Sequence, residues 1–289
     1  MDRRKFLALA GAATAAPLVS KTAQATEITE DNPEFFGVLV DTTRCIGCRQ
    51  CEVACAEAND LPVPDIKNDN ALDAERTTAT DQWTVVNRYE TDEGEIFAKK
   101  QCMHCGQPAC AAACLTNAME KTETGPVTWD GGKCMGCRYC MLSCPFNIPK
   151  FEYESINPKI QKCIMCSERL EEGGMPACVE ACPADALMFG KKQELMQIAR
   201  VRIYSHPDTY VRHIYGEHEV GGTSWLYLSS VPFEQLGFRT DLGTLTYPDY
   251  TREFLYAVPL VFLLGPPLLY GLHHLAGRDG DENTEGGHS

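Results

Sequence analysis

Sixteen cysteines in a chain of 289 residues fall into four groups of four, and none lies outside them. In chain order the groups are Cys45, Cys48, Cys51 and Cys55; Cys102, Cys105, Cys110 and Cys114; Cys134, Cys137, Cys140 and Cys144; and Cys163, Cys166, Cys178 and Cys182. Groups one and three have the spacing C-x2-C-x2-C-x3-C, which is typical of bacterial ferredoxins. Three thiolates this close together can hold three corners of one 4Fe–4S cluster, while the fourth is directed toward a neighbouring cluster. The sequence therefore predicts four 4Fe–4S clusters.

Zinc sites and disulfides are the other common uses of an even number of cysteines. Structural zinc sites favour two C-x2-C pairs separated by a loop, which fits group four alone but not the close triplets of groups one and three. Disulfides are typical of exported chains, but bridging gives no reason for a run as regular as Cys134, Cys137 and Cys140. An exported zinc-binding structural protein therefore stays as a remote alternative.

The spacing between the groups predicts how they pair. Nineteen residues separate Cys114 from Cys134, about what a small two-cluster ferredoxin needs between its halves, so groups two and three form an inner unit. Groups one and four then form an outer unit. Because the fourth cysteine of a group binds the other cluster of its unit, four ligand sets follow. Set 1 is Cys45, Cys48, Cys51 and Cys182; set 2 is Cys55, Cys163, Cys166 and Cys178; set 3 is Cys102, Cys105, Cys110 and Cys144; set 4 is Cys134, Cys137, Cys140 and Cys114.

These patterns predict an α+β fold. We expect two pseudo-symmetric ferredoxin-like units, each binding two clusters, in a cluster domain over residues 26–203. The inner unit covers about 99–150, and the outer unit about 37–58 together with 155–190. In the insertion at 59–98, alternating apolar residues on both sides of a turn at 92–94 predict a hairpin. A helix is expected over 191–203 and a strand over 224–229. Residues 204–250 form either a docking or linker segment, or loops that close the cluster domain.

The two ends of the chain indicate export and a membrane anchor. Residues 1–25 combine a basic start, an apolar stretch and an A-x-A cleavage site, which is typical of a signal peptide. The pair Arg3 and Arg4 resembles a twin-arginine motif. Residues 254–272 carry no charge and, at about 1.5 Å per residue, can extend about 28 Å, enough for one transmembrane helix. The acidic tail at 273–289 is expected to be disordered.

Composition and isolated residues limit the remaining functions. The net charge of −14, without a basic stripe, argues against nucleic-acid binding. No nucleophile–base pair or phosphate loop occurs, so we expect a non-catalytic chain with no cofactor-binding residues beyond the cluster ligands. His104 is expected to be packed or exposed rather than a ligand. Lys99, Lys100 and Arg138 lie beside cysteines and either raise cluster potentials or belong to a solvated face.

Several motifs make the chain resemble the four-cluster electron-transfer (beta) subunit of the complex iron–sulfur molybdoenzyme family. They are GCRQC (47–51), KKQCMHC (99–105), GCRYCMLSCPFNIPKFEY (136–153) and CVEACPADALMFGKKQELM (178–196). The later segment IYGEHEVGGTSWLYLSSVP (214–232), the twin-arginine start and the terminal span are similar to the iron–sulfur subunit of periplasmic, membrane-bound nickel–iron hydrogenases of the hydrogenase-2 type. The family's clusters are cross-ligated as in sets 1 to 4.

The resemblance implies that the chain relays electrons through four 4Fe–4S clusters. The partners would be a large catalytic oxidoreductase subunit, expected to be a nickel–iron hydrogenase, and an integral-membrane quinone-reactive or cytochrome subunit. The same role in a molybdenum or tungsten enzyme, such as a formate dehydrogenase or a polysulfide-type reductase, remains open because nothing in this chain identifies the catalytic partner. The expected location is the periplasmic side of the cytoplasmic membrane, with a single-pass anchor and export by the twin-arginine route.

Overall fold

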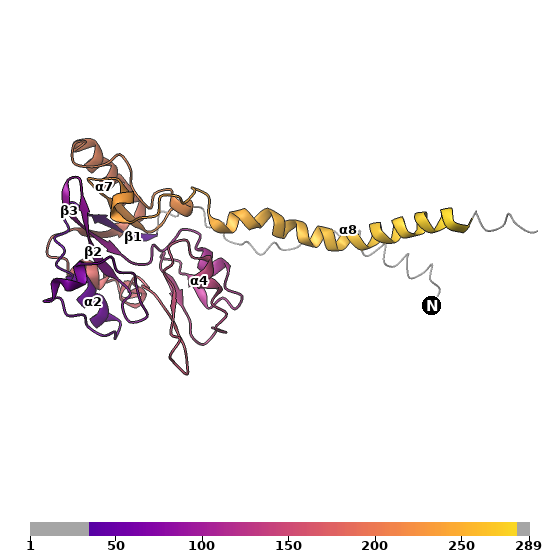
Figure 1. The fold of residues 1–289 in the computed structure, drawn as a ribbon, viewed down its shortest axis with the longest axis horizontal. Coiled ribbons are helices and arrows are strands. Elements are labelled where there is room, and N and C mark those ends of the chain that lie inside the picture. Colours follow the sequence, from indigo (N-terminus) through magenta and orange to yellow (C-terminus); the bar gives the residue numbers. More distant parts are fainter. Residues whose placement is uncertain (1–34, 282–289) are drawn as a thin grey trace, which may run out of the picture. The chain divides into compact units, whose positions relative to one another are not determined.

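The computed structural model describes residues 35–281, so the predicted signal peptide and residues 282–289 lie outside the described residues. Short strands and helices alternate through the cysteine-rich part, which has mixed α and β content (Figure 1). The strands are β1 Phe36–Asp41, β2 Val85–Thr91, β3 Gly94–Lys100, β4 Met119–Lys121, β5 Val127–Trp129, β6 Lys150–Phe151, β7 Ile160–Gln161, β8 Leu187–Lys191 and β9 Trp225–Leu228. The α-helices are α2 Gln50–Ala58, α3 Ala109–Ala112, α4 Tyr139–Ser143, α5 Ser167–Glu171, α6 Ala177–Glu180, α7 Lys192–Ser205 and α8 Tyr247–Asp281. Three 3-10 turns complete the elements: η1 Asp69–Leu72, η2 Glu219–Gly221 and η3 Phe233–Leu236.

The main sheet has the strand order β8–β1–β9, with β1 antiparallel to β8 and parallel to β9. Side chains alternate along β1 because a strand directs successive residues to opposite faces. Leu39 therefore packs with Leu195 of α7, while Val38 and Val40 pack on the other face with Cys178. Because β1 leads into cysteine group one and β8 follows group four, their pairing brings the two ends of the cysteine region together.

Strand β9 is built into the core. All four of its residues, from Trp225 to Leu228, are fully buried, as is typical of a parallel strand covered on both faces. Phe233 and Leu236 of η3 are also buried. Of the two interpretations of residues 204–250, this packing favours a segment that closes the cluster domain. The predicted strand at 224–229 is confirmed, and α7 confirms the predicted helix at 191–203.

The insertion forms the predicted hairpin, in which β2 and β3 pair from Val85 opposite Lys100 to Thr91 opposite Gly94. A buried carboxylate joins it to α2. Glu52 is 2% exposed. Its Oε1 accepts hydrogen bonds from the backbone N–H of Val86 at 2.6 Å and from Arg76 at 2.5 Å. Its Oε2 accepts from Arg49 at 3.2 Å and from Gln82 at 2.9 Å. This network holds the hairpin against the helix that carries Cys51 and Cys55.

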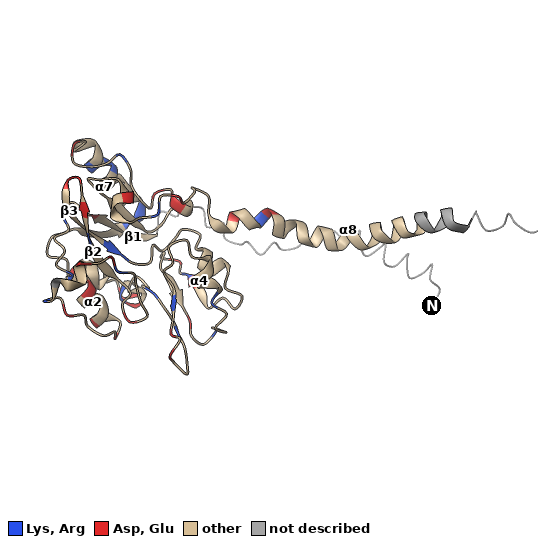
Figure 2. Ribbon diagram, in the orientation of Figure 1, with Lys and Arg blue, Asp and Glu red and all other residues tan. Residues whose placement is uncertain are grey.

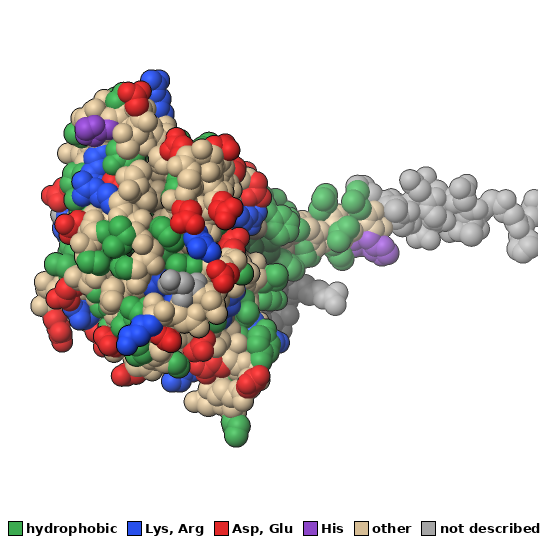
Figure 3. All heavy atoms as spheres, turned by 60° about the vertical axis from the view of Figure 1, so that its left-hand side comes forward, with side chains coloured by type: hydrophobic (Ala, Val, Ile, Leu, Met, Phe, Trp, Pro, Cys, Tyr) green, Lys and Arg blue, Asp and Glu red, His purple; other side chains and the backbone are tan. Residues whose placement is uncertain are grey.

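Among the described residues, α8 is long and apolar enough to cross a membrane, with a mean hydropathy of 1.7 over its apolar window. It continues through Pro259, Pro266 and Pro267. Figure 2 shows that the charged residues in its described part lie near its start, and Figure 3 shows apolar side chains over much of its visible surface. The helix begins before the predicted span of 254–272 and runs on to Asp281, so residues 273–281 are helical rather than disordered. Once formed, a helix gains one hydrogen bond for each added residue, which extends it past the apolar stretch.

Candidate metal centres

The cysteines of set 1 line one cavity. Its wall consists of Cys45, Cys48, Cys51 and Cys182 together with Val40, Ile46, Arg49, Val86, Lys99, Ala184, Ala186 and Leu187. Burial raises the pKa of Cys45 to about 11, and the thiols of Cys182 and Cys48 raise it as well. Cys182 comes from the far end of the cysteine region and still lies beside the first group, as the predicted set requires.

Set 2 lines a second cavity, formed by Cys55, Cys163, Cys166 and Cys178 with Asn59, Trp83, Thr84, Lys99, Ile164, Met165, Pro176 and Trp225. Burial raises the pKa of Cys55 well above its ordinary value, and the thiols of Cys163, Cys178 and Cys166 add to this rise. Cys51 and Cys55 are therefore four residues apart on α2 but border different cavities. Helix α2 also packs against α6, which carries Cys178.

The members of sets 3 and 4 are also neighbours, as their mutual effects on pKa show. Burial raises the pKa of Cys105 well above its ordinary value, and the neighbouring thiols of Cys144, Cys102 and Cys110 raise it further. Burial also raises the pKa of Cys140 to about 11, with further rises from Cys134, Cys114 and Cys137. Helices α3 and α4, which follow each other in groups two and three, pack together. The structure thus brings together the four cysteines of each predicted set.

The sites suit a group that carries positive charge and needs thiolates. Cysteine binds metal as the thiolate, yet burial raises the pKa of most of these thiols, so ionisation in place requires a cation at the centre of each set. Backbone N–H groups also reach the sulfurs: Ala118 and Met119 donate to Cys114 Sγ at 3.2 and 3.4 Å. No three His, Cys, Asp or Glu among the described residues are close enough to hold a single metal ion. A cubane cluster has its irons at separate corners and spreads its thiolates farther apart than one zinc ion does.

The cysteine loops of groups one and three share a left-handed backbone. Gly47 and Gly136 have φ of 69° and 73°, and the following Arg49 and Arg138 have φ of 59° and 61°. A Cβ at Gly47 would lie 2.5 Å from the Phe97 ring of β3, whereas a Cβ at Gly136 would meet nothing within 4 Å. The hairpin therefore closes directly over the first loop.

We expect Gly47→Ala to lower the stability of the folded chain clearly more than Gly136→Ala does. Both replacements place a side chain in the left-handed region, at about 1–2 kcal/mol, but only Gly47→Ala adds overpacking against Phe97, which typically costs about 1–3 kcal/mol more. The measurement is the temperature at which each full-length variant unfolds and releases iron. Equal temperatures for the two variants would show that the hairpin does not constrain this loop.

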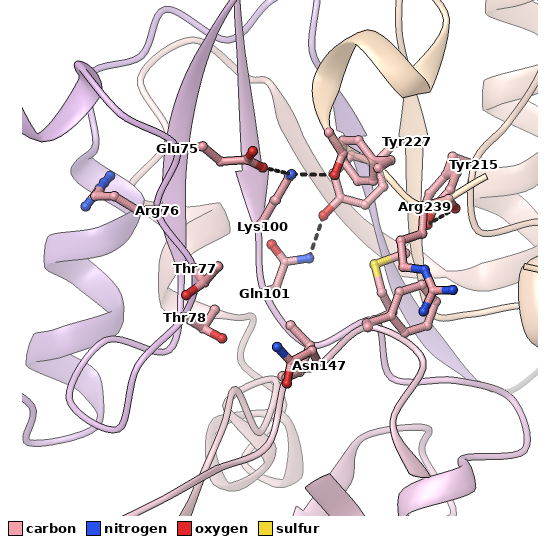
Figure 4. A pocket seen from close by; sticks show the side chains of 15 residues that line it. Glu75, Arg76, Thr77, Thr78, Lys100, Gln101, Asn147, Tyr215, Tyr227 and Arg239 are labelled. Atoms are coloured by element: carbon pink, nitrogen blue, oxygen red, sulfur yellow. Dashed lines mark hydrogen bonds and ion pairs between the residues drawn. The ribbon is translucent and has the colours of Figure 1, made fainter. Parts of the chain in front are cut away.

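The basic residues beside the cysteines differ in their surroundings. Lys100 is paired with Glu75 at 2.6 Å, beside a cavity of about 200 Å³ that is separate from the cysteine sets (Figure 4). Arg138 is exposed and lies over the Phe151 ring at 5.4 Å. The solvated-face interpretation suits the exposed Arg138, while Lys100 is half-buried. The same interpretation is wrong for Lys99, which is 2% exposed. The sequence around a lysine near a cysteine is the same whether the lysine is exposed or buried, because its burial depends on elements far away in the chain.

His104 and Lys162 are both buried, and each is close in sequence to a cysteine ligand. His104 is fully buried, and its Nδ1 accepts a hydrogen bond from the backbone N–H of Val127 at 2.8 Å, which confirms a packed side chain. Lys162 is 2% exposed and donates to the backbone oxygens of Val127 and Cys163. Sequence reasoning missed Lys162, although its position beside Cys163 is the same signal that singled out Lys99.

Known proteins match this arrangement. A model of the 4Fe–4S dicluster domain matches residues 94–192. The hydrogenase-2 operon protein HybA of Escherichia coli O157:H7 is 35% identical over 325 residues, covering 96% of this chain and 99% of that protein. The chain belongs to the family of four-cluster iron–sulfur electron-transfer subunits. Within this family, a protein of Nitratidesulfovibrio vulgaris is 50% identical over 287 residues, covering 96% of this chain and 78% of the relative. The formate dehydrogenase-O iron–sulfur subunit of Escherichia coli K12 is 33% identical over 205 residues, or 68% of each chain.

Family membership confirms the predicted cofactor: the chain binds multiple 4Fe–4S clusters. It also confirms the resemblance drawn from the cysteine motifs. As an iron–sulfur electron-transfer subunit, the chain passes single electrons between clusters, and its own side chains serve to bind, insulate and tune them.

Proposed function

We propose that this chain relays electrons through four 4Fe–4S clusters, held by sets 1 to 4, between a periplasmic nickel–iron hydrogenase subunit and a membrane quinone-reactive subunit. The observation that carries the proposal is that the four sets pack against one another in one continuous order. Electron transfer needs redox centres that follow each other closely, with no isolated member.

The order comes from shared apolar clusters. Cys178 of set 2 packs with Cys51 and Cys182 of set 1. Cys163 of set 2 packs with Cys102 and Cys144 of set 3. A third cluster combines Cys110 of set 3 with the set 4 cysteines Cys114, Cys134 and Cys140. These contacts support a linear wire that runs from set 1 through sets 2 and 3 to set 4.

The surroundings of set 4, at one end of the wire, support contact with a membrane partner. Helix α3, which lies between Cys110 of set 3 and Cys114 of set 4, contacts the start of α8. Thr246 just before α8 donates a hydrogen bond to Gln107 at 3.3 Å. Cys137 of set 4 is exposed. Large apolar side chains in its group and the preceding one, Leu115, Met135, Tyr139 and Leu142, are exposed as well. We therefore assign set 4 to the membrane subunit and set 1 to the catalytic subunit.

The pseudo-symmetric organisation is part of the proposal. Arg49 before α2 has φ 59° and ψ 12°, and Arg138 before α4 has φ 61° and ψ 12°, so the two ferredoxin-type loops match closely. The packing of α2 with α6 and of α3 with α4 supports an outer and an inner unit with the predicted bounds. We further propose export by the twin-arginine signal at 1–25 and anchoring by α8, with the clusters on the periplasmic side.

The choice of catalytic partner rests on the length of the matches. The hydrogenase-2 operon protein matches 96% of this chain, whereas the formate dehydrogenase-O subunit matches 68%. The full-length match supports a hydrogenase. A molybdenum or tungsten enzyme, such as a formate dehydrogenase or a polysulfide-type reductase, is the second candidate because it would use the same wire.

The test uses the chain in its native complex, extracted from membranes with mild detergent and kept free of oxygen. We expect hydrogen to bleach the brown visible absorption of the clusters, and a quinone analogue to restore it. Formate would leave the spectrum unchanged. Bleaching by formate instead of hydrogen would favour the second candidate. A complex that dithionite bleaches but neither donor reduces would contradict both, and a colourless, zinc-loaded chain would support the zinc alternative.

A further inference from the structure

We propose that Lys99 is the shared counter-cation of the clusters in sets 1 and 2 and that its ammonium group raises the reduction potentials of both. The inference rests on the proposed ligand sets and adds a tuning residue to them. Lys99 acts as a positioning charge, because the sulfur ligands of both clusters come from cysteines at positions 45–55 and 163–182.

Lys99 lies between the two clusters. It is the one lysine in the walls of both cysteine cavities, as described for residues 35–281. The side chain is 2% exposed. Its Nζ donates to Gln101 Oε1 at 2.9 Å and lies 4.4 Å from the centre of the Trp225 ring. Both of these partners are neutral, so they orient the ammonium group without cancelling its charge.

The charge of Lys99 needs an anion. Within the described part of the chain, no carboxylate forms an ion pair with Lys99, while the adjacent Lys100 is paired with Glu75. An isolated buried charge costs several kcal/mol unless an opposite charge compensates it. The remaining candidates are the thiolates, and a cubane cluster bound by four thiolates is an anion before and after reduction.

The sign of the effect follows from electrostatics. Reduction adds one negative charge to a cluster, and a positive charge held nearby in a low-dielectric interior stabilises that added electron. Charge and hydrogen bonding near the sulfurs are among the factors that set cluster potentials. Because one ammonium group borders both cavities, its removal should lower both potentials and leave those of sets 3 and 4 nearly unchanged.

The test is a redox titration of the full-length chain, followed by electron paramagnetic resonance, for Lys99→Met and the control Lys100→Met. We expect Lys99→Met to move two of the four potentials downward by at least about 59 mV, a tenfold change in the ratio of reduced to oxidised cluster for a one-electron couple. Lys100→Met should move none of them by that amount, because its charge is already paired with Glu75.

A second variant, Gln101→Glu, tests the same proposal if the Lys99→Met chain does not assemble with its clusters. Gln101→Glu changes little in shape and places a carboxylate beside Nζ, so it should lower the same two potentials while keeping the lysine. The proposal is overturned if the variant that assembles moves no potential beyond the Lys100→Met control, or moves only one. Chemical mediators supply the electrons in these titrations. A failure of hydrogen to reduce the native complex would therefore contradict the proposed function without affecting this result.

Discussion

Replacing Cys55 with serine is expected to remove or alter the signal of one cluster, the same signal that changes when Cys163 is replaced. Both cysteines border the second cavity, although 107 residues of sequence separate Cys55 from Cys163. A serine oxygen is a poorer ligand for iron than a thiolate, so we expect loss of up to about four of about sixteen irons, one cluster's share. The measurement is iron content together with electron paramagnetic resonance of the reduced chain.

Cys51→Ser is the matched control for this prediction. Cys51 lies one turn before Cys55 on the same helix but borders the first cavity, together with Cys182. We expect Cys51→Ser and Cys182→Ser to share a second, different signal. The comparison needs no prior assignment of spectra to clusters. If Cys55→Ser and Cys51→Ser affected the same signal, each group would bind its own cluster and the cross-ligated sets would be wrong.

Glu52→Ala is expected to cause the largest loss of stability among the substitutions considered for this chain. The buried carboxylate pairs with Arg49 at 3.1 Å and Arg76 at 2.5 Å and also accepts from the Val86 N–H. Removing one partner of a buried ion pair typically costs about 3–5 kcal/mol, because the other charge stays buried without compensation. For a domain of this size that corresponds to a fall of about 6–20 °C in unfolding temperature.

Glu75→Ala provides the control for that measurement. Its side chain is 51% exposed and pairs with Lys100 on the rim of the hairpin. Exposed pairs contribute about 0–1 kcal/mol, so this variant should unfold within about 4 °C of the original chain. Thermal scans of the full-length proteins in detergent, run at one heating rate, give the comparison. Similar falls in both variants would show that Glu52 does not hold the hairpin to α2.

Local patterns in the sequence predicted the elements that depend on neighbouring residues. The alternation around the turn at 92–94 predicted the hairpin of β2 and β3, and the apolar stretch at 254–272 predicted the interior of α8. Hydrophobic period and turn residues are short-range properties, so they can be read without the fold. The ends of α8 were less predictable, since helix propagation carries the backbone beyond the apolar residues.

The burial of Lys99 could not be predicted from local sequence. Its neighbours in sequence are the same whether it faces solvent or the core, and adjacent Lys100 is 20% exposed and paired with Glu75. What buries Lys99 is the indole of Trp225 from β9 and the cavities of two distant cysteine sets. The segment at 204–250 poses the same problem, because its role depends on the parallel pairing of β9 with β1.

The sequence by itself determined the chemistry of this protein: sixteen cysteines in four groups, two of them at ferredoxin spacing, with one apolar helix following them. The spacing within a cysteine group is a short-range property of the sequence, and three thiolates so close together are typical of iron–sulfur cluster ligands. The tertiary structure decided which distant thiols are neighbours and which lysine is buried beside them. Those relations depend on the pairing of β1 with β8 and the packing of α2 on α6, contacts between segments far apart in the chain.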